Sequence, residues 1–484
     1  MPQRIKPTAA ASVLFTLLLC SCGTYSNYQN QTVSTDSLLR TDFALADSSL
    51  FILHASFSDD PQLTRLIDEG LTHNSDLNIA RVQVDAAKAA LRTAKGELFP
   101  SLELGANGET ARFKNSGNDS QTESKFNFGA EASWEIDIFG RMQNAKKAAA
   151  ATVEERMAYV QAVQVELVAT IATSYYQLEM YDSQMAETRD IITSWDESIR
   201  ALKALMAVGE ATIDEVNQAE ASRLEAESTL EELVMQTTQA ENALCALLGR
   251  HSGPIGRGDF LTSAQCISHP PKIPIEALAS RPDVRQAEAE LKRAFYATNE
   301  ARAALYPSLN LSGTIGWTND ASEVVSPAGL LTRALASLTQ PVFANGRLRA
   351  AVRQAQAEQE EAKIHFRQTI LNAGKEVNDI LATQQYAQRA IVLNTQQIEK
   401  LSNVLTATES RMHYDSEVNY LQVLLARQSL LQARLSLFSN CYALIESHIE
   451  LYRALGGGST VIRLTKAHGY TSAIKENSFD IDVQ

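Results

Sequence analysis

The sequence predicts an α+β membrane protein built from two structural repeats, each combining long helices with one β-hairpin. Three observations predict this class. The phrase ELFPSLEL at Glu97–Leu104 returns as ALYPSLNL at Ala304–Leu311. The segment Phe126–Ile138 alternates apolar and polar residues in the manner of a strand. The segment Arg141–Val208 holds neither proline nor glycine, which is typical of one very long helix.

The two repeats keep a common register along the chain. Pro100 returns as Pro307, a shift of 307 − 100 = 207 residues, and the same shift places Asp76 on Asp283. A period of this length is far too long for a solenoid of short repeats. We therefore expect one duplicated architecture, with a first repeat over 61–250, a linker over 251–275 and a second repeat over 276–458.

Each repeat is expected to run helix, hairpin, long helix, return helix. In the first repeat one helix covers Pro61–Gly96, and Pro100 then prevents its continuation. The long helix over Arg141–Val208 would measure roughly 100 Å at about 1.5 Å per residue. Gly209 breaks it, and a return helix follows over Ala211–Leu248.

The hairpins, expected over 99–139 and 306–343, carry strands with one apolar and one polar face. At about 3.3 Å per residue, the strand over Phe126–Ile138 would measure roughly 40 Å, enough to cross a bilayer when tilted. A long strand in a soluble sandwich is the alternative interpretation. One chain supplies only four such strands, whereas about eight is the usual minimum for a transmembrane barrel. We therefore expect two or three chains to pool their strands in a cyclic oligomer.

The return helix of the second repeat indicates how the helices pack. Its apolar residues recur at alternating spacings of four and three, at Leu431, Leu435, Phe438, Tyr442, Ile445, Ile449 and Tyr452. A seven-residue apolar repeat favours left-handed coiled-coil packing. We interpret this stripe as helix packing and nothing more.

The N-terminus is typical of an exported lipoprotein. Residues 1–21 combine basic Arg4 and Lys6 with an apolar core that is too short to span a bilayer. The residues before Cys22 resemble the bacterial lipobox, in which the signal is cleaved and the cysteine thiol takes a diacylglycerol. Residues 22–60 would then be a lipid-anchored segment. A plain signal peptide with chance cysteines is the alternative.

The composition argues against several other functions. The net charge of −14 disfavours nucleic acid as a partner. The eight histidines are scattered, and no catalytic grouping of Ser, His and Asp stands out, so we expect no enzyme, cofactor or metal site. Cys245, Cys266 and Cys441 leave any disulfide unassigned. The tripeptide Arg257-Gly258-Asp259 is interpreted as part of an exposed linker, and the tail 459–484 has no assigned role.

Four segments carry a resemblance to a known family. They are WEIDIFGR at Trp134–Arg141, the stretch Ser280–Leu311 that begins SRPDVRQAEAEL, QPVFANGR at Gln340–Arg347 and LYRALGGG at Leu451–Gly458. Together with the lipobox, they resemble the TolC-like outer-membrane efflux proteins, the outer-membrane factor family. The likeness is specifically to the lipoprotein branch that serves RND-type multidrug pumps, and it covers the chain as far as Gly458.

This resemblance implies an assembly, a location and partners. It implies a homotrimer with a twelve-stranded transmembrane β-barrel continued by a long α-helical coiled-coil tunnel. It places the protein in the bacterial outer membrane, anchored to outer-membrane lipid through a palmitate-bearing Cys22 and extending into the periplasm. The implied partners are a periplasmic adaptor (membrane fusion) protein and an inner-membrane RND-type transporter. The implied function is a passive gated conduit for small toxic compounds in a tripartite efflux pump.

The resemblance also implies a gate and a docking site at the helix tips, here 207–217 and 413–425. Gly209 and Ser416 mark the adaptor-docking tips, with serine where relatives carry glycine. The periplasmic gate candidates are Asp214, Glu215, Gln422 and Leu425. The second-repeat places Gln422 and Leu425 are usually acidic in relatives. We expect Leu425 to narrow the gate and Glu215 to supply an acidic ring; the alternative is that Leu425 packs in a helix seam.

Two further functions remain open from the sequence. One is a duct for type I protein secretion, which the lipobox and the glycine-rich ending LGGG make less favoured than the pump. The other is a pore-less, lipid-anchored coiled-coil spacer or adhesin. Strands of lipid-crossing length argue against the spacer, because a spacer would not need them.

Overall fold

The computed structural model describes residues 27–29, 60–114, 120–260, 281–319, 330–411 and 420–457. The lipid-anchor candidate Cys22, the docking candidate Ser416, Cys266 and the tail 459–484 lie outside these residues.

The chain forms two compact units, and each takes segments from both repeats. The sheet unit falls within 1–33, 82–157 and 286–368. The helix unit falls within 34–81, 158–285 and 369–484.

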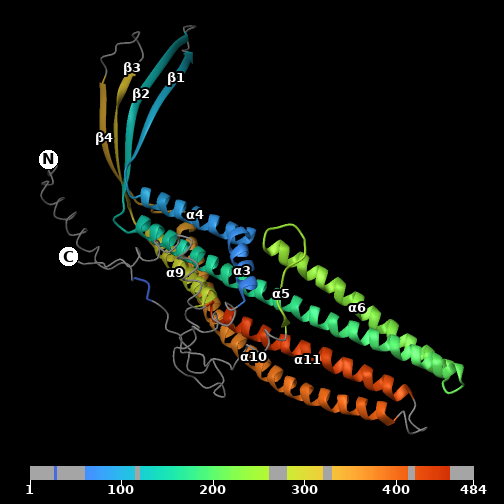
Figure 1. Cartoon of the computed structure of the whole chain (residues 1–484). Helices are drawn as coiled ribbons and strands as arrows, with labels where there is room; N and C mark the ends of the chain where they lie inside the picture. The colour runs from blue at the N-terminus through green and yellow to red at the C-terminus, as the bar shows by residue number, and fades with distance from the viewer. Residues whose placement is uncertain are drawn as a thin grey trace. The chain divides into compact units, whose positions relative to one another are not determined.

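Four antiparallel strands form the sheet unit's single sheet, paired in the order β1-β2-β3-β4 (Figure 1). The strands are β1 (Ser101–Lys114), β2 (Ser120–Ile136), β3 (Ser308–Asn319) and β4 (Leu330–Thr339), and they lie within the two predicted hairpins. The alternation in β2 ends at Ile136 rather than at Ile138 as predicted, because Ile138 belongs to the turn that leads into the next helix.

The register places apolar residues from all four strands on one face, with Leu335 of β4 on the other face as an exception. Leu104 pairs with Ala130, and Ala130 pairs with Ile315, so these three side chains share a face. Among the side chains of this face that the structure describes, the exposed large residues are Leu102, Leu104, Phe128, Trp134, Ile315, Trp317 and Leu338. Their exposure in a single chain means that this apolar face needs a cover other than water.

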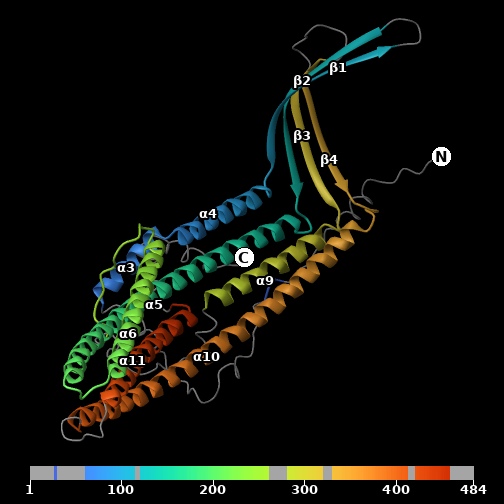
Figure 2. The same cartoon turned by 90° about the vertical axis from the view of Figure 1, so that its right-hand side faces the viewer.

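A row of glycines crosses the middle of the sheet. Gly105 pairs with Gly129, and Gly129 pairs with Gly316. A Cβ on Gly316 would lie 2.4 Å from the Phe128 carbonyl oxygen, and one on Gly129 would lie 2.7 Å from the Ile315 carbonyl oxygen. Glycine is therefore required where β2 and β3 approach each other. Figure 2 shows that the strands curve along their length.

The helices follow the order expected for two repeats. They are α3 (Pro61–His73), α4 (Ser75–Gly96), α5 (Arg141–Ala207), α6 (Ile213–Leu247), α9 (Pro282–Ala303), α10 (Arg347–Arg411) and α11 (Tyr420–Ala454). The long helices α5 and α10 contain 67 and 65 residues, and the return helices α6 and α11 contain 35 each. Among the described helices, none carries an apolar stretch long enough to cross a membrane.

The predicted continuous helix over Pro61–Gly96 is wrong, because the helix breaks at Asn74 into α3 and α4. The Asn74 backbone N–H still donates to Gly70 of α3 at 2.9 Å. Its side-chain oxygen accepts from the Leu77 N–H at 2.9 Å, which caps the start of α4. An asparagine that caps a new helix leaves the apolar spacing on both sides intact, so periodicity alone did not reveal the break.

The same junction recurs in the second repeat with different chemistry. The Asn74 side-chain amide donates to the Leu247 carbonyl at the end of α6, at 2.9 Å. The Arg281 guanidinium donates to the Ala454 carbonyl at the end of α11, at 2.5 Å. The shift is 281 − 74 = 207 and 454 − 247 = 207, equal to the repeat shift found in the sequence. Both copies therefore fasten the last carbonyls of the return helix to the residue that precedes the hairpin-bound helix.

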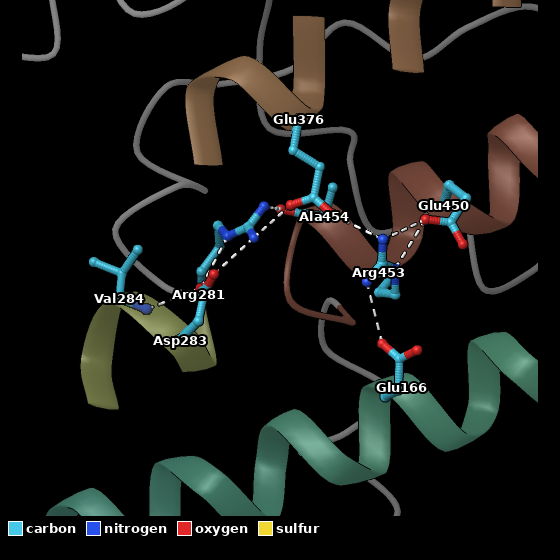
Figure 3. A network of polar contacts seen from close by, with 8 residues as sticks. All are labelled: Glu166, Arg281, Asp283, Val284, Glu376, Glu450, Arg453 and Ala454. Carbon is cyan, nitrogen blue, oxygen red and sulfur yellow. Dashed lines mark hydrogen bonds and ion pairs between the residues drawn. The ribbon is translucent and has the colours of Figure 1, made fainter. Parts of the chain in front are cut away.

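In the second repeat this junction is an ion network (Figure 3). Arg281 contacts Asp283 at 2.8 Å and Glu376 at 2.7 Å, and its side chain is only 9% exposed. Arg453 extends the network to the other Glu376 oxygen at 2.9 Å, and also to Glu450 and Glu166. The network joins α5, α9, α10 and α11 of the helix unit.

The core of the helix unit is apolar and continuous. Among its largest fully buried residues are Leu63 of α3, Ile171 and Tyr175 of α5, and Leu244 of α6. The predicted heptad stripe of α11 contributes Ile445, Ile449 and Tyr452 to the core, and its Phe438 and Tyr442 pack against it. The interpretation of this stripe as helix packing agrees with these contacts.

Candidate functional site

The tip of the first repeat is a tight turn between α5 and α6. Gly209 takes a φ of 82°, which favours glycine, and its N–H donates to the Met206 carbonyl at 3.1 Å. The next N–H, of Glu210, donates to the Leu205 carbonyl at 3.0 Å, which completes a Schellman motif. The predicted helix break at Gly209 is thus a left-handed C-cap. The neighbouring Val208 is 72% exposed, so the turn presents an apolar side chain.

The two acidic gate candidates of the first repeat lie in the first turn of α6. The Glu215 carboxylate accepts hydrogen bonds from the Thr212 backbone N–H at 2.7 Å and from the Thr212 hydroxyl at 3.0 Å. Thr212 in turn accepts from the Glu215 N–H at 3.3 Å, so the pair forms a capping box. Asp214 is exposed and lies in the same turn. Both carboxylates therefore lie where the helix dipole favours negative charge.

The gate candidates of the second repeat lie at the start of α11. Gln422 and Leu425 are both exposed, Leu425 at 55%. Their neighbours Val423 and Leu424 are buried, at 1% and 2% exposure. Within one chain, Leu425 is therefore not one of the residues of the buried helix seam. Its role at a gate remains a prediction.

The tips of the two repeats share a small apolar core. Val216 of α6 and Leu424 of α11 pack in one cluster with Trp195, Ile199 and Leu202 of α5. The repeat register is visible here too, because Val216 and its counterpart Val423 are both buried. This cluster holds the start of α11 against the end of α5, so the position of Leu425 depends on first-repeat residues.

Arg427 adds a polar tie at the same place. Its guanidinium donates to the Ser198 hydroxyl of α5 at 2.7 Å and to the Glu409 carboxylate of α10 at 2.8 Å. Sequence reasoning missed Arg427, because its partners are far away in the chain and carry no motif. The only sequence signal is its place two residues after Leu425, the last residue of the predicted tip.

The polar face of the sheet forms the second candidate site, a wall for an aqueous path. Glu103 pairs with Glu131, Glu131 with Thr314, and Thr314 with Arg333, so this row carries a charged residue on β1, β2 and β4 and a hydroxyl on β3. Charged and polar residues on one face, opposite an apolar face, are typical of strands that separate lipid from water.

Aromatic side chains mark the places where helices give way to strands. The Trp134 indole N–H donates to the Leu98 carbonyl at 3.1 Å, and the rings of Phe139 and Tyr306 stack with centroids 4.8 Å apart. Phe99 and Phe343 are 71% and 85% exposed. Exposed aromatic rings of this kind favour membrane–water interfaces.

The linker is not exposed as predicted at Arg257. The Arg257 side chain is 13% exposed and pairs with Asp182 of α5 and with Glu241 of α6, the latter at 2.6 Å. The hydrogen bond to Asp182 raises the pKa of Arg257. The Gly258 N–H donates to the Tyr175 hydroxyl at 3.0 Å. Residues 251–260 are therefore held against the helix unit, which makes an adhesive role of the tripeptide unsupported.

The described residues contain no group of three or more His, Cys, Asp or Glu arranged to hold a metal ion. Cys245 is buried and Cys441 half-buried, and both are free thiols. Burial raises the pKa of the Cys441 thiol, which lowers its reactivity.

Comparison with known proteins identifies the family. The family described as "Outer membrane efflux protein" matches residues 66–250 and 273–457, close to the two predicted repeats. This chain belongs to the outer membrane efflux protein family. It is 30% identical over 413 residues to the cation efflux system protein CusC of Escherichia coli O6:H1, covering 83% of this chain and 87% of the relative.

Other relatives agree. The solvent efflux pump outer membrane protein SrpC of Pseudomonas putida is 28% identical over 414 residues, which cover 84% of this chain and 87% of SrpC. A crystal structure of CusC, described with transmembrane channel formation, matches with a TM-score of 0.81 at 27% identity, covering 90% of this chain and 100% of that chain.

These matches confirm the resemblance inferred from the sequence and the predicted fold class. They also confirm the predicted function, an outer-membrane channel subunit of an efflux pump, and its location in the bacterial outer membrane. The match is to an efflux family and not to a family of enzymes.

Proposed function

We propose that three copies of this chain close a twelve-stranded barrel and a helical tunnel, which together form the exit duct of a tripartite pump. The observation that carries this proposal is the four-stranded sheet with one apolar and one polar face. In the described chain, β1 pairs only with β2 and β4 only with β3. Open strand edges and an exposed apolar face are both removed when β4 of one copy pairs with β1 of the next inside a bilayer.

The duct needs no catalysis of its own. A transporter in the inner membrane supplies the energy, and an adaptor in the periplasm joins it to the tips of this protein. We assign the adaptor contact to the turns marked by Gly209 and Ser416. The exposed Val208 and Ile213, at 72% and 57%, supply apolar surface beside Gly209 for a helical partner.

The cargo is proposed to be small toxic compounds. The names of the relatives include cation efflux and solvent efflux. A water-filled duct with a polar wall accepts both classes, so selection belongs to the transporter. Deleting the gene for this protein should raise the sensitivity of the cell to the substrates of the partner transporter by at least several-fold. An unchanged sensitivity to all such compounds, with the transporter present, would contradict the assignment.

We propose that Leu425 narrows the periplasmic aperture, with Glu215 and Asp214 supplying negative charge nearby. Support comes from the exposure of Leu425 beside the buried Val423 and Leu424, since a buried core fixes its backbone while the side chain stays free. A ring of three leucines would oppose the passage of hydrated ions, because apolar constrictions exclude water.

Leu425→Ser should therefore raise the closed-state conductance of the purified protein in a planar lipid film. Leu224→Ser is the matched control, because Leu224 is equally exposed, at 59%, on α6. Equal conductance of the two variants and the unmodified protein would sink the gate assignment, while leaving the channel assignment intact.

A further inference from the structure

The structure describes one short piece of the N-terminal segment, Asn27–Gln29, and it lies against helices of the sheet unit. The Tyr28 ring meets the Phe295 ring of α9 edge-to-face, with centroids 5.6 Å apart and planes at 68°. Phe295 in turn meets Tyr296 edge-to-face at 5.5 Å. Aromatic pairs in this geometry stabilise a contact beyond the area that they bury.

A lysine of α5 also contacts this segment. The Lys147 ammonium donates to the Asn27 side-chain oxygen at 3.4 Å and lies 5.5 Å from the centre of the Tyr296 ring. The segment is thus held by two helices, one from each sequence repeat, through a ring contact and a charged donor.

The Tyr28 hydroxyl contributes no hydrogen bond to this contact. The hydroxyl is buried and has no hydrogen-bond partner among the described residues. Burial, with the nearby Glu288 carboxylate, raises the pKa of Tyr28 to about 12. The ring, and not the hydroxyl, therefore holds the segment in place.

We propose that Tyr28 is the docking residue that fixes the lipid-bearing N-terminus to the channel wall, by inserting its ring against Phe295 between α9 and α5. This inference rests on the lipid anchor that the sequence predicts at Cys22. Tyr28 is the sixth residue after Cys22, a reach of at most about 20 Å. The lipid on Cys22 can therefore move only a short distance from the fixed position of Tyr28.

The position of the docked Tyr28 also indicates the level of the membrane surface along the molecule. Lys147 is six residues into α5, or about 9 Å along the helix from Arg141, which follows β2. Phe295 is eight residues before the end of α9, about 12 Å from the turn that leads into β3. A lipid chain that starts within about 20 Å of this point enters the near leaflet of a bilayer whose core is about 30 Å thick. The aromatic residues at the strand-to-helix turns favour that same level.

Photo-crosslinking tests the docking in intact outer membranes. Tyr28 is replaced by p-benzoylphenylalanine, the membranes are irradiated, and tryptic peptides are analysed by mass spectrometry. The N-terminal peptide is expected to crosslink to the peptide that contains Phe295. The same probe at Gln29, which is exposed, should give a several-fold lower yield of that product. Equal yields from the two positions, or a Tyr28 product with another peptide, would overturn the docking.

The same spectra keep the two claims apart, because the mass of the N-terminal peptide reports the acylation of Cys22. An acylated peptide without the crosslink leaves the anchor standing and overturns the docking. A crosslinked peptide without a lipid supports the docking of Tyr28 and contradicts the lipid anchor at Cys22.

The consequence is tested with three variants. Tyr28→Ala and Phe295→Ala should release the acylated N-terminal peptide to proteinase K several-fold faster than the unmodified protein does. Tyr28→Phe should behave like the unmodified protein, because it keeps the ring. Fast release from Tyr28→Phe as well, or slow release from Tyr28→Ala, would contradict the role assigned to the ring. Lys292→Ala, on the same helix but paired with Glu154 at 2.8 Å, is the control.

Discussion

At the scale of single residues, Gly316 of β3 pairs with Gly129 of β2 at a position with no room for a Cβ. A methyl group on Gly316 would meet the Phe128 carbonyl oxygen at 2.4 Å, a contact that only a backbone shift can relieve. Gly316→Ala should therefore cost about 1 to 3 kcal/mol of stability. Gly105→Ala, in the same cross-strand row but with no atom within 4 Å of its Cβ, is the matched control.

The readout is the temperature at which the oligomer band dissociates on an unboiled gel. Gly316→Ala should lower it and Gly105→Ala should leave it nearly unchanged. Similar values for both variants would mean that the close approach of β2 and β3 is not a constraint.

His448 of α11 is a buried residue that makes stability depend on pH. Its Nδ1 donates to the Leu444 carbonyl at 2.7 Å, and its Nε2 accepts from the Gln384 amide at 2.9 Å. This pair of hydrogen bonds requires the neutral form of the imidazole ring. Burial lowers the pKa of His448. A depressed folded-state pKa means that the unfolded chain takes up the proton first, so stability is lost as pH falls below about 6.5.

His448→Gln should therefore reduce the difference between the thermal unfolding midpoints at about pH 7.5 and about pH 5.5. His251→Gln, at an exposed position, should not reduce it. Circular dichroism of the detergent-solubilised protein gives both midpoints. If the unfolding midpoint of His448→Gln depends on pH as strongly as that of the unmodified protein, other groups cause the pH dependence.

Some residues of the tips were predictable from the sequence and others were not. Gly209 was, because a lone glycine after a long run without glycine or proline leaves few other places for the turn. The capping box of Thr212 and Glu215 has a sequence signature, yet the family resemblance drew attention to Glu215 as a gate residue instead. Arg427 was not predictable, since tertiary packing alone brings its partners together.

At the scale of elements, the repeat junction shows one task performed by two kinds of side chain. Asn74 and Arg281 both hold the last carbonyl of a return helix, but Arg281 also neutralises Asp283 and Glu376. Asn74→Ala removes a cap and one hydrogen bond, an expected loss of about 1 to 2 kcal/mol. Arg281→Ala leaves half-buried carboxylates short of a partner, an expected loss of about 2 to 3 kcal/mol.

Denaturant unfolding of the two variants measures which substitution lowers the free energy of unfolding more. Arg285→Ala, an exposed arginine of α9 that bonds to Gln161 at 2.8 Å, is the control and should change stability little. An equal loss for Asn74→Ala and Arg281→Ala would show that the ion network adds nothing to the carbonyl contact.

Element boundaries were predictable where one physical signal dominates. Strict alternation placed β2 to within two residues of its end, and the run without proline or glycine placed α5 to within one. The break between α3 and α4 was missed, because Asn74 interrupts hydrogen bonding without interrupting the apolar spacing. The same limit applies to residues 251–260, where the ion pairs of Arg257 cannot be seen in composition.

At the scale of the whole molecule, the sequence could predict that one chain is incomplete but not how many chains complete it. Four strands with an apolar face imply pooling, and periodicity is satisfied by two copies or by three. Only the family resemblance selected three. The structure of one chain adds the open edges of β1 and β4, which are the surfaces on which the copy number depends.

The contact with the periplasmic adaptor is also a property of the assembled molecule. Val208 and Ile213 flank the Gly209 turn and are 72% and 57% exposed, which is costly for apolar side chains without a partner. Val208→Asp and Ile213→Asp should reduce co-purification of the adaptor several-fold, because a carboxylate would be desolvated at the contact. Leu224→Asp, at an equally exposed site on α6 at 59%, should retain the adaptor. All three variants should still form the heat-modifiable oligomer, since none of these side chains is part of the tip core. If the tip variants retain the adaptor while the Leu224 variant loses it, the docking surface lies along the side of α6 and not at the turn.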